Sequence, residues 1–281
     1  MTQTLPVPTL DHVVINVRDR IDDGADSFRR LGFTLTPRGY HTLGSMNHLA
    51  MFGTEYLELI AAPAGETGRQ DILTSPEGLN GLVFGTEDSD RTYATLHAAG
   101  VPIGPPRQFS RPVELPDGAR DATFRTVTLT PGAVPAGRLY FCHHLTRDLV
   151  WRDEWRHHAN GVIGVARAVI VAQEPESLGA VFGRMFGSDA VRNTSNGCTL
   201  AVGLSRFDVV TPAALRGEFG DAAPDGGGRA QYMAGLTFRT RSLDAAAAAF
   251  AAGQVAGVRR DDRRIVVPAT AAFGAVLEFV E

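Results

Sequence analysis

Two residues in this sequence have side chains that could do chemistry together. His12 lies in the segment LDHVVINV and Glu58 in the segment EYLELIA, and both segments read as β-strands. Strand side chains alternate between two faces, so Glu58 shares a face with Tyr56 and Ile60. A carboxylate on such a covered face is costly unless it is paired, protonated or bound to a metal ion. The two residues therefore indicate imidazole and carboxylate chemistry.

His12 also has an interpretation without chemistry. Its strand face holds Leu10, Val14 and Asn16 as well, so this face mixes apolar and polar side chains. A half-buried strand can carry a histidine that is only hydrogen-bonded or solvated. The neighbourhood of His12 leaves both interpretations open, and the rest of the chain has to decide between them.

The composition is that of an ordinary soluble globular protein. The chain has 281 residues, of which 44% are hydrophobic and 21% charged, and this length predicts one large domain or two of medium size. A formal net charge of -4 argues against nucleic acid or a membrane surface as partner, because both require concentrated positive charge. The opening MTQTLPVPTL lacks signal-peptide features and no apolar run could span a bilayer, so we expect a cytoplasmic protein.

The residues that the chain lacks exclude several catalytic classes. All 27 basic residues are arginine, so mechanisms that need a lysine, such as Schiff bases or the Walker A loop, are excluded. Cys142 and Cys198 lie far apart and form no CxxC pair for a thiolate zinc site. The sequence contains neither HExxH nor a GxSxG nucleophile elbow. Histidine and carboxylate chemistry remains.

The chain contains an internal repeat. Residues 80–101 and 234–255 each read as a short strand, a Ser/Asp helix start and an alanine-rich helix that ends near glycine. Residues 12–33 have a similar counterpart at 167–187. The positions shared by the first two segments are Gly81/Gly235, Leu82/Leu236, Phe84/Phe238, Thr86/Thr240, Asp90/Asp244, Ala94/Ala248 and Ala98/Ala252.

Four repeated units follow from these similarities. Each continues into short alternating runs that read as strands, which gives a β-α-β-β-β pattern. We therefore predict an α+β fold in which four βαβββ modules are paired into two domains. The first domain is expected over residues 1–147, with modules near 10–62 and 80–146, and the second over residues 162–281. Residues 148–161 would form the linker.

The predicted linker is charged and contains both tryptophans, whose rings we expect to pack against the two domains. Two pairs of adjacent histidines lie at its borders, His143 with His144 and His157 with His158. A four-histidine metal site is one interpretation of these pairs. The alternative is that they are solvated loop residues.

A histidine on the first strand of such a unit and a glutamate on its last strand resemble the vicinal oxygen chelate superfamily. This superfamily includes glyoxalase I, fosfomycin-resistance enzymes, extradiol dioxygenases and bleomycin-binding proteins. The segments LDHVVINV, HTLGSMNHLAMFG, YLELIA and FCHHLTRDLVW followed by HHANG more closely resemble its glyoxalase-like group. The motifs lie within residues 10–161, whereas the four-unit plan covers the chain. The resemblance implies paired units whose sheets curve around one cleft, with ligands on the first and last strands.

The ligands that the resemblance implies in the first unit are His12 and Glu58. In the second unit the first-strand position falls on Gly81, which has no ligand atom. The last strand, RLYFCHHL, offers His144 or, after a shift of one residue in register, His143. We favour His144 as the third ligand.

The choice between these histidines rests on an alignment of the last strands of the two units. Placing Tyr140 on Tyr56 puts Cys142 at the ligand position of Glu58, with His144 two residues on and on the same face. Four further residues are candidates for contact with the substrate. These candidates are Asn16, Tyr56, Cys142 and His143.

Two histidines and a carboxylate suit a divalent zinc, iron, nickel or manganese ion and leave positions open for substrate oxygens. Such a metal acts as a Lewis acid while a nearby group moves a proton. His48 is the candidate for that group, together with Glu58, and its alternative is a surface residue of an edge strand. A site without metal is the alternative for the cofactor.

The second domain is predicted to be degenerate. Arg167 replaces the first-strand histidine there, and Glu278, in AVLEFVE, is the one residue at a ligand-like position. The resemblance places the ligands of extradiol dioxygenases with four such units in this half. An Fe(II) dioxygenase is therefore the weakest of three functional readings.

The leading interpretation is a metal-dependent, glyoxalase-like lyase or isomerase that acts on a small oxygenated or electrophilic metabolite. The alternative of another class is a metal-free protein that binds and sequesters a drug or metabolite, as bleomycin-binding proteins do. Aromatic cleft walls would favour that alternative, and 8% aromatic residues make no strong case. The expected partner is a small molecule, with a homodimer left open.

Overall fold

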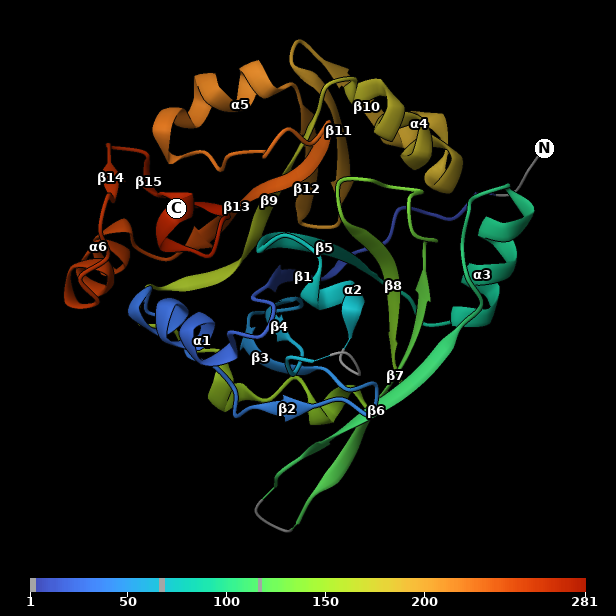
Figure 1. Ribbon diagram of the computed structural model, residues 1–281, viewed down its shortest axis with the longest axis horizontal. Coiled ribbons are helices and arrows are strands. Elements are labelled where there is room, and N and C mark those ends of the chain that lie inside the picture. Colours follow the sequence, from blue (N-terminus) through green and yellow to red (C-terminus); the bar gives the residue numbers. More distant parts are fainter. Residues whose placement is uncertain (1–3, 66–68, 116–117) are drawn as a thin grey trace.

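The computed structural model describes residues 4–65, 69–115 and 118–281. Within these ranges each half of the chain forms one eight-stranded sheet (Figure 1). The strands of the first sheet are β1 (Leu10–Asn16), β2 (Gly39–Tyr40), β3 (Met46–Met51), β4 (Tyr56–Ala61), β5 (Gly78–Gly85), β6 (Arg107–Val113), β7 (Arg120–Thr128) and β8 (Arg138–His144). The strands of the second are β9 (Val162–Ala172), β10 (Val191–Thr194), β11 (Gly197–Val202), β12 (Ser205–Val210), β13 (Gln231–Thr240), β14 (Arg259–Arg260), β15 (Arg264–Val267) and β16 (Val276–Val280).

Helices surround the two sheets in Figure 1. The α-helices are α1 (Ile21–Arg30), α2 (Gln70–Leu73), α3 (Ser89–Ala98), α4 (Pro175–Phe186), α5 (Pro212–Phe219) and α6 (Leu243–Ala252). Short 3-10 turns are η1 (Arg147–Leu149), η2 (Asp153–Trp155), η3 (Ser188–Ala190), η4 (Gly220–Ala222) and η5 (Ala269–Ala271). No helix in the described ranges is both long and apolar enough to cross a membrane.

The two sheets have the same strand order, so the second half repeats the first. The order is β2-β3-β4-β1-β5-β8-β7-β6 in one sheet and β10-β11-β12-β9-β13-β16-β15-β14 in the other. In each, the first strands of the two units lie antiparallel at the centre, and each is parallel to the last strand of its own unit. The predicted α+β fold of four paired βαβββ modules is confirmed.

The glycine shared by the repeats lies at a close approach between central strands. Gly81 pairs with Val14 of β1, and a Cβ added to Gly81 would lie 2.9 Å from the Val14 Cβ. A Cβ added to Gly235 would lie 2.3 Å from the carbonyl oxygen of Val276. Both distances are too short for a side chain, so this repeat position requires glycine.

Alternation along β1 separates a shared core from a hollow in the first sheet. Val13 and Ile15 point into a core that also contains residues of the second half, such as Ile170. His12 and Val14 point to the other face of the strand. There, Val14 packs in a separate apolar cluster formed by the first half and the linker tryptophans.

Aromatic side chains join the two halves across the shared core. Phe84 of β5 lies 5.1 Å from Phe141 in its own sheet, measured between ring centroids. Across the junction it lies 5.1 Å from Phe186 of α4 and 5.5 Å from Phe207 of β12. Phe84, Phe141 and Phe207 are almost wholly buried, so the two halves share one hydrophobic core rather than only a linker.

The first sheet curls until its two edge strands meet. The amide of Thr42, just after β2, donates to the carbonyl oxygen of Ser110 on β6 over 2.9 Å. The amide of Ser110 donates to the Thr42 hydroxyl over 3.2 Å. These bonds close the sheet almost into a barrel, so that its strands curve around a hollow.

The shared core predicts a large effect for one substitution. Phe84→Ala removes a buried ring that packs against both halves, and we expect it to lower the free energy of unfolding by about 3–5 kcal/mol. Urea denaturation followed by circular dichroism measures this change. Leu204→Ala is the control, because Leu204 is 81% exposed and should change stability by less than about 0.5 kcal/mol. An equally small loss in Phe84→Ala would contradict the shared core.

Candidate functional site

A cavity of about 320 Å³ lies in the hollow of the first sheet. His12 of β1 and Glu58 of β4 both line it, so the structure brings together the two residues that the alternation singled out. Its walls are partly aromatic, and the rings of Phe109 and Phe124 stack with 5.3 Å between centroids. The cavity therefore combines titratable groups with apolar walls, as ligand sites commonly do.

Both ring nitrogens of His12 are engaged. Nδ1 lies 2.6 Å from Asp11 Oδ1, and Nε2 lies 2.9 Å from the hydroxyl of Tyr140. Burial alone would raise the pKa of Asp11, but the charge of His144 and the hydrogen bonds from both imidazoles outweigh it and lower that pKa to about 2. Asp11 is thus a carboxylate that only accepts, so His12 donates from Nδ1. In the neutral ring Nε2 then carries the lone pair and accepts from Tyr140.

An irregularity in β1 explains why Asp11 reaches the ring of its own neighbour. Strict alternation would place Asp11 and His12 on opposite faces. The pairing of β1 with β5 shifts register between Leu10 and His12, as at a β-bulge. A bulge re-aims side chains locally, and the 3% exposed Asp11 carboxylate turns to the imidazole.

Glu58 is buried with one hydrogen bond and one imidazole near it. Asn47 Nδ2 donates to Glu58 Oε1 over 2.6 Å, while Oε2 lies 3.8 Å from His12 Nε2. Among the described residues, His12 is the one basic side chain within ion-pair distance of this carboxylate. A buried carboxylate with so little compensation is a natural ligand for a cation.

Tyr140 takes the place in the second unit that Glu58 has in the first. Glu58 pairs with the residue two positions after His12, and Tyr140 pairs with the residue two positions after Gly81. The alignment that put Cys142 in this place is therefore wrong by two residues. Burial, followed by the charge of Glu58, raises the pKa of Tyr140 well above its ordinary value, so its hydroxyl stays protonated.

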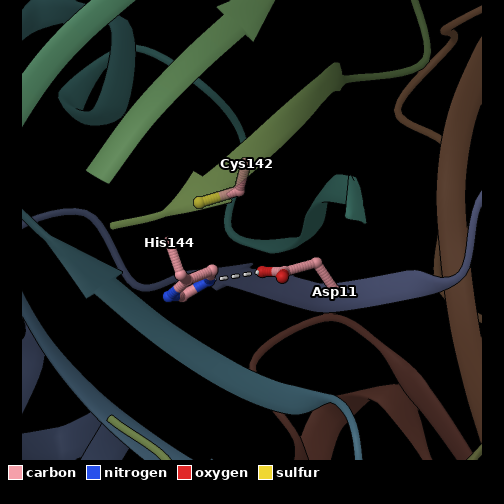
Figure 2. Close-up of side chains that lie close together, drawn as sticks. All are labelled: Asp11, Cys142 and His144. Atoms are coloured by element: carbon pink, nitrogen blue, oxygen red, sulfur yellow. Dashed lines mark hydrogen bonds and ion pairs between the residues drawn. The ribbon is translucent and has the colours of Figure 1, made fainter. Parts of the chain in front are cut away.

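His144 lies on the far side of Asp11 from His12. Figure 2 shows Asp11, Cys142 and His144 close together, with His144 Nε2 3.0 Å from Asp11 Oδ1. Their ligand atoms all lie within 4.8 Å of one another, close enough to hold a metal ion. Burial raises the pKa of the Cys142 thiol well above its usual value, so the thiol is protonated in this cluster. The structure thus joins His144 to His12 through Asp11, and its role as a ligand stays a prediction.

The other histidines near the linker have separate partners. His143 Nδ1 lies 3.2 Å from the hydroxyl of Ser89, at the start of α3. His158 lies 2.8 Å from the carbonyl oxygen of Met51. These contacts give no support to a four-histidine site. They also place His143 against α3 rather than against the substrate.

The sequence comparison gives a family. Residues 10–196 match the family model of the glyoxalase-like domain, which is more than half of the chain. The chain belongs to the glyoxalase-like domain family. No curated protein matches this sequence. The predicted membership of the vicinal oxygen chelate superfamily is confirmed.

Solved structures with the same fold include functionally different proteins. A hypothetical protein from Staphylococcus aureus has a TM-score of 0.69 at 12% identity, over 96% of this chain and 98% of its own. A mutant of 4-hydroxymandelate synthase from Streptomyces coelicolor has a TM-score of 0.59 at 13% identity, over 98% and 93%. The Mn(II)-bound glyoxalase from Novosphingobium aromaticivorans has a TM-score of 0.55 at 14% identity, over 98% and 82%. At these identities the likeness shows the fold alone.

Two residues predicted for the glyoxalase-like site lie outside its cavity. His48 pairs with Leu59 on the face of β3 opposite to Asn47, and its Nδ1 contacts the carbonyl oxygen of Thr36. It therefore cannot move a proton in the cavity, which corrects its predicted catalytic role. Asn16 donates to the carbonyl oxygens of Ile72, Ser75 and Pro76 and so fastens the segment after α2. Asn16 is a structural residue here, whereas Tyr56 and Cys142 do line the cavity.

The corresponding positions of the second glyoxalase-like sheet are filled by ion pairs. Arg167, in the place of His12, has its Nε 2.6 Å from Asp208, in the place of Glu58. Arg167 also pairs with Glu218 of α5, a helix that packs on this sheet. Glu278 accepts from Thr237 over 2.6 Å and from Arg264 over 2.7 Å. The arginine thus closes the hollow that the histidine leaves open in the first sheet.

Sequence reasoning missed several cavity residues of the glyoxalase-like domain. Asp11, which contacts the His12 ring without lining the cavity itself, was also missed, because the register shift is invisible in a single strand. Tyr140 was used only to align the strands. The segment RQFSRPV of β6 alternates Arg107, Phe109 and Arg111 on one face, and this pattern was a usable signal. Arg138 of β8 also lines the cavity.

The ion pairs of the second half predict a dependence of stability on pH. Burial would raise the pKa of Asp208, but the hydrogen bond from Thr199 and the charge of Arg167 outweigh it and lower that pKa. The carboxylate therefore stabilises the fold above its ordinary pKa, and this contribution is lost as pH falls through the lowered value. Asp208→Asn should lower the free energy of unfolding by about 1–3 kcal/mol at pH 7. The difference in this free energy between wild type and variant should become smaller below about pH 4.

Urea denaturation of both proteins between pH 7 and pH 3 measures this gap. Asp121→Asn is the matched control, since Asp121 is an exposed carboxylate on β7. A gap between wild type and Asp208→Asn that stays constant over this pH range would contradict the charge contribution.

Proposed function

We propose that this protein is a metal-dependent enzyme of the glyoxalase-like lyase or isomerase type, which acts on a small oxygenated molecule in the cavity of the first sheet. One observation carries the proposal. His12 Nε2 and Glu58 Oε2 face each other in the cavity, while Asp11 holds the opposite nitrogen of the same ring. A carboxylate behind the imidazole is the arrangement that orients histidine ligands in metalloenzymes.

The donor atoms fit a divalent metal ion. The bond from Nδ1 to Asp11 leaves the lone pair of His12 on Nε2, which is the atom that faces Glu58. The hydroxyl of Tyr140 is a third donor atom, 2.9 Å from the same nitrogen. Nitrogen and oxygen donors of this kind suit zinc, iron, nickel or manganese. His12 and Glu58 would hold the ion, which when bound would act as a Lewis acid toward a substrate carbonyl.

The residues around the cavity include a group that can accept a proton and a group that can donate a hydrogen bond in such a reaction. Asn47 fixes Glu58 Oε1, so Oε2 is the oxygen that would take a proton from a carbon next to a carbonyl group whenever it is not holding the ion. The protonated hydroxyl of Tyr140 can donate a hydrogen bond to an oxygen that gains negative charge. Burial lowers the pKa of His41, another lining residue, to about 4, so it is neutral at pH 7.

A metal-free binding protein is the second candidate, and the aromatic walls favour it. The stacked Phe109 and Phe124, together with Tyr56, offer flat apolar surface to a ligand. Gly81, at the first-strand position of the second unit, contributes no ligand atom. An Fe(II) dioxygenase with its ligands in the second half has less support, because Arg167 occupies the histidine position there within ion pairs.

Metal content tests the proposal. Wild-type protein reconstituted with zinc, manganese, nickel or anaerobic iron and freed of excess should hold about one ion per chain by mass spectrometry of the metal. His12→Ala and Glu58→Gln should lose it, because each removes one of the donor atoms. Cys142→Ala should keep it, because that thiol belongs to the cluster with Asp11 and His144.

Two results would overturn this assignment. Wild-type protein that holds no stoichiometric metal after reconstitution, yet binds an aromatic ligand, would leave the binding protein as the function. Loss of metal from Cys142→Ala with retention in Glu58→Gln would move the ion to the cluster of Asp11, Cys142 and His144.

A further inference from the structure

The cavity of the first sheet is lined by more positive than negative side chains. Its arginines are Arg69, Arg107, Arg111 and Arg138. Its acidic lining residues are Glu58 and Asp71, and Asp71 is already paired with Arg69 through bonds of 2.7 and 2.5 Å. Glu58 is then the one remaining acid of the lining, against three further arginines, Arg107, Arg111 and Arg138.

Arg111 is the one buried arginine among the four that line the cavity. It is 6% exposed, and the part of the chain that the structure describes gives its guanidinium no hydrogen bond or ion pair. Burial lowers its pKa, only partly opposed by the charges of Tyr56 and Glu58. A buried guanidinium in this state costs free energy unless an anion pairs with it.

The surrounding backbone leaves room for this guanidinium. Arg111 lies near Gly39 of β2, where the two edges of the curled sheet meet. A Cβ on Gly39 would lie 2.9 Å from Arg111 Nη1 and 2.5 Å from Asn47 Oδ1. The glycine thus allows Arg111 and Asn47, the residue that holds Glu58, to lie side by side against bare backbone.

Arg138 is the second arginine without a partner. Its Nε and Nη2 are buried and make no hydrogen bond to the described residues. On β8 it lies two residues before Tyr140, on the same face. In the register of the sheet Arg138 pairs with Gly81, which pairs with Val14, which pairs with Glu58. Arg138 and Glu58 therefore lie in one row of the sheet, separated by Gly81 and Val14.

We propose that the substrate is a small organic acid whose carboxylate is bound by Arg111 and Arg138, so that its oxygenated carbons lie beside His12 and Glu58. Guanidinium groups bind carboxylates through paired charge-assisted hydrogen bonds. The stacked Phe109 and Phe124 would hold the apolar body of the acid. This inference rests on the proposed function for the reacting end of the molecule, while the arginines alone carry the carboxylate site.

Benzoate and benzamide form a matched pair of probes, because they have the same shape and differ in charge. Calorimetric titration into protein stripped of metal by a chelator should show one benzoate per chain and binding of benzamide that is weaker by at least about tenfold. Arg111→Met and Arg138→Met should each weaken benzoate by at least about tenfold, because each removes a charged donor. Arg91→Met, an exposed arginine of α3, is the control and should bind benzoate like wild type.

The thermal midpoint separates a binding role of Arg111 from a structural one. Without ligand, Arg111→Met should unfold at the same temperature as wild type or higher, because the change removes a buried unpaired charge. Benzoate should raise the midpoint of wild type and not that of Arg111→Met. A lower midpoint of the unliganded variant, with unchanged benzoate affinity, would make Arg111 structural and overturn the proposal.

Other outcomes would overturn it as well. These are equal affinity for benzoate and benzamide, no saturable benzoate binding to wild type, or phenylphosphonate binding more than about tenfold tighter than benzoate, which would assign the site to a phosphoryl group. Because the titration uses metal-free protein, its result is independent of the metal test. Benzoate binding without metal binding would refute the proposed metal-dependent enzyme and support the carboxylate site. Metal binding without benzoate binding would support the enzyme and refute the carboxylate site.

Discussion

The site depends on one hydrogen-bonded carboxylate, that of Asp11. It takes a bond from His12 and another from His144, and these contacts keep it ionised although it is buried. An ionised Asp11 fixes the proton of His12 on Nδ1 and directs the lone pair of Nε2 toward Glu58 and Tyr140. The shift of register in β1 makes this contact possible. A small irregularity of the backbone therefore decides which chemistry the imidazole can do.

The two halves show what the same fold does with a different residue at that position. His12 leaves the first hollow open, whereas Arg167 fills the second with bonds to Asp208 and Glu218. A guanidinium has donors on all sides and forms fixed ion pairs, while an imidazole offers one lone pair. The second half then supports the first sheet through the shared aromatic core around Phe84. The difference between His12 and Arg167 at one position of the repeat therefore accompanies the difference between a sheet with a cavity site and a sheet closed by ion pairs.

The fold could be predicted from the sequence because the internal repeat shows the four βαβββ units. The shared Gly81 and Gly235 mark a close approach to a neighbouring strand in the second unit of each half. Alternation also found His12 and Glu58, since burial of a polar side chain is visible within one strand. It failed for Asp11, Tyr140 and Arg111 for physical reasons: a bulge, the register between distant strands, and the curl that brings β6 to β2. These depend on how strands meet, which a local pattern does not contain.

The charged groups of the cavity lie in two parts, one with the arginines and one with His12 and Glu58. Glu58 carries one negative charge, whereas Arg107, Arg111 and Arg138 carry three positive ones, so the lining favours a bound carboxylate. The arginines would then act mainly on binding, because their partner is already charged before the reaction. Charge that develops during the reaction would fall at the other end, where the Tyr140 hydroxyl and a metal on His12 and Glu58 could stabilise it selectively. Separation of a binding end from a reacting end is what lets one cavity hold an acid firmly and still lower the barrier to its proton transfer.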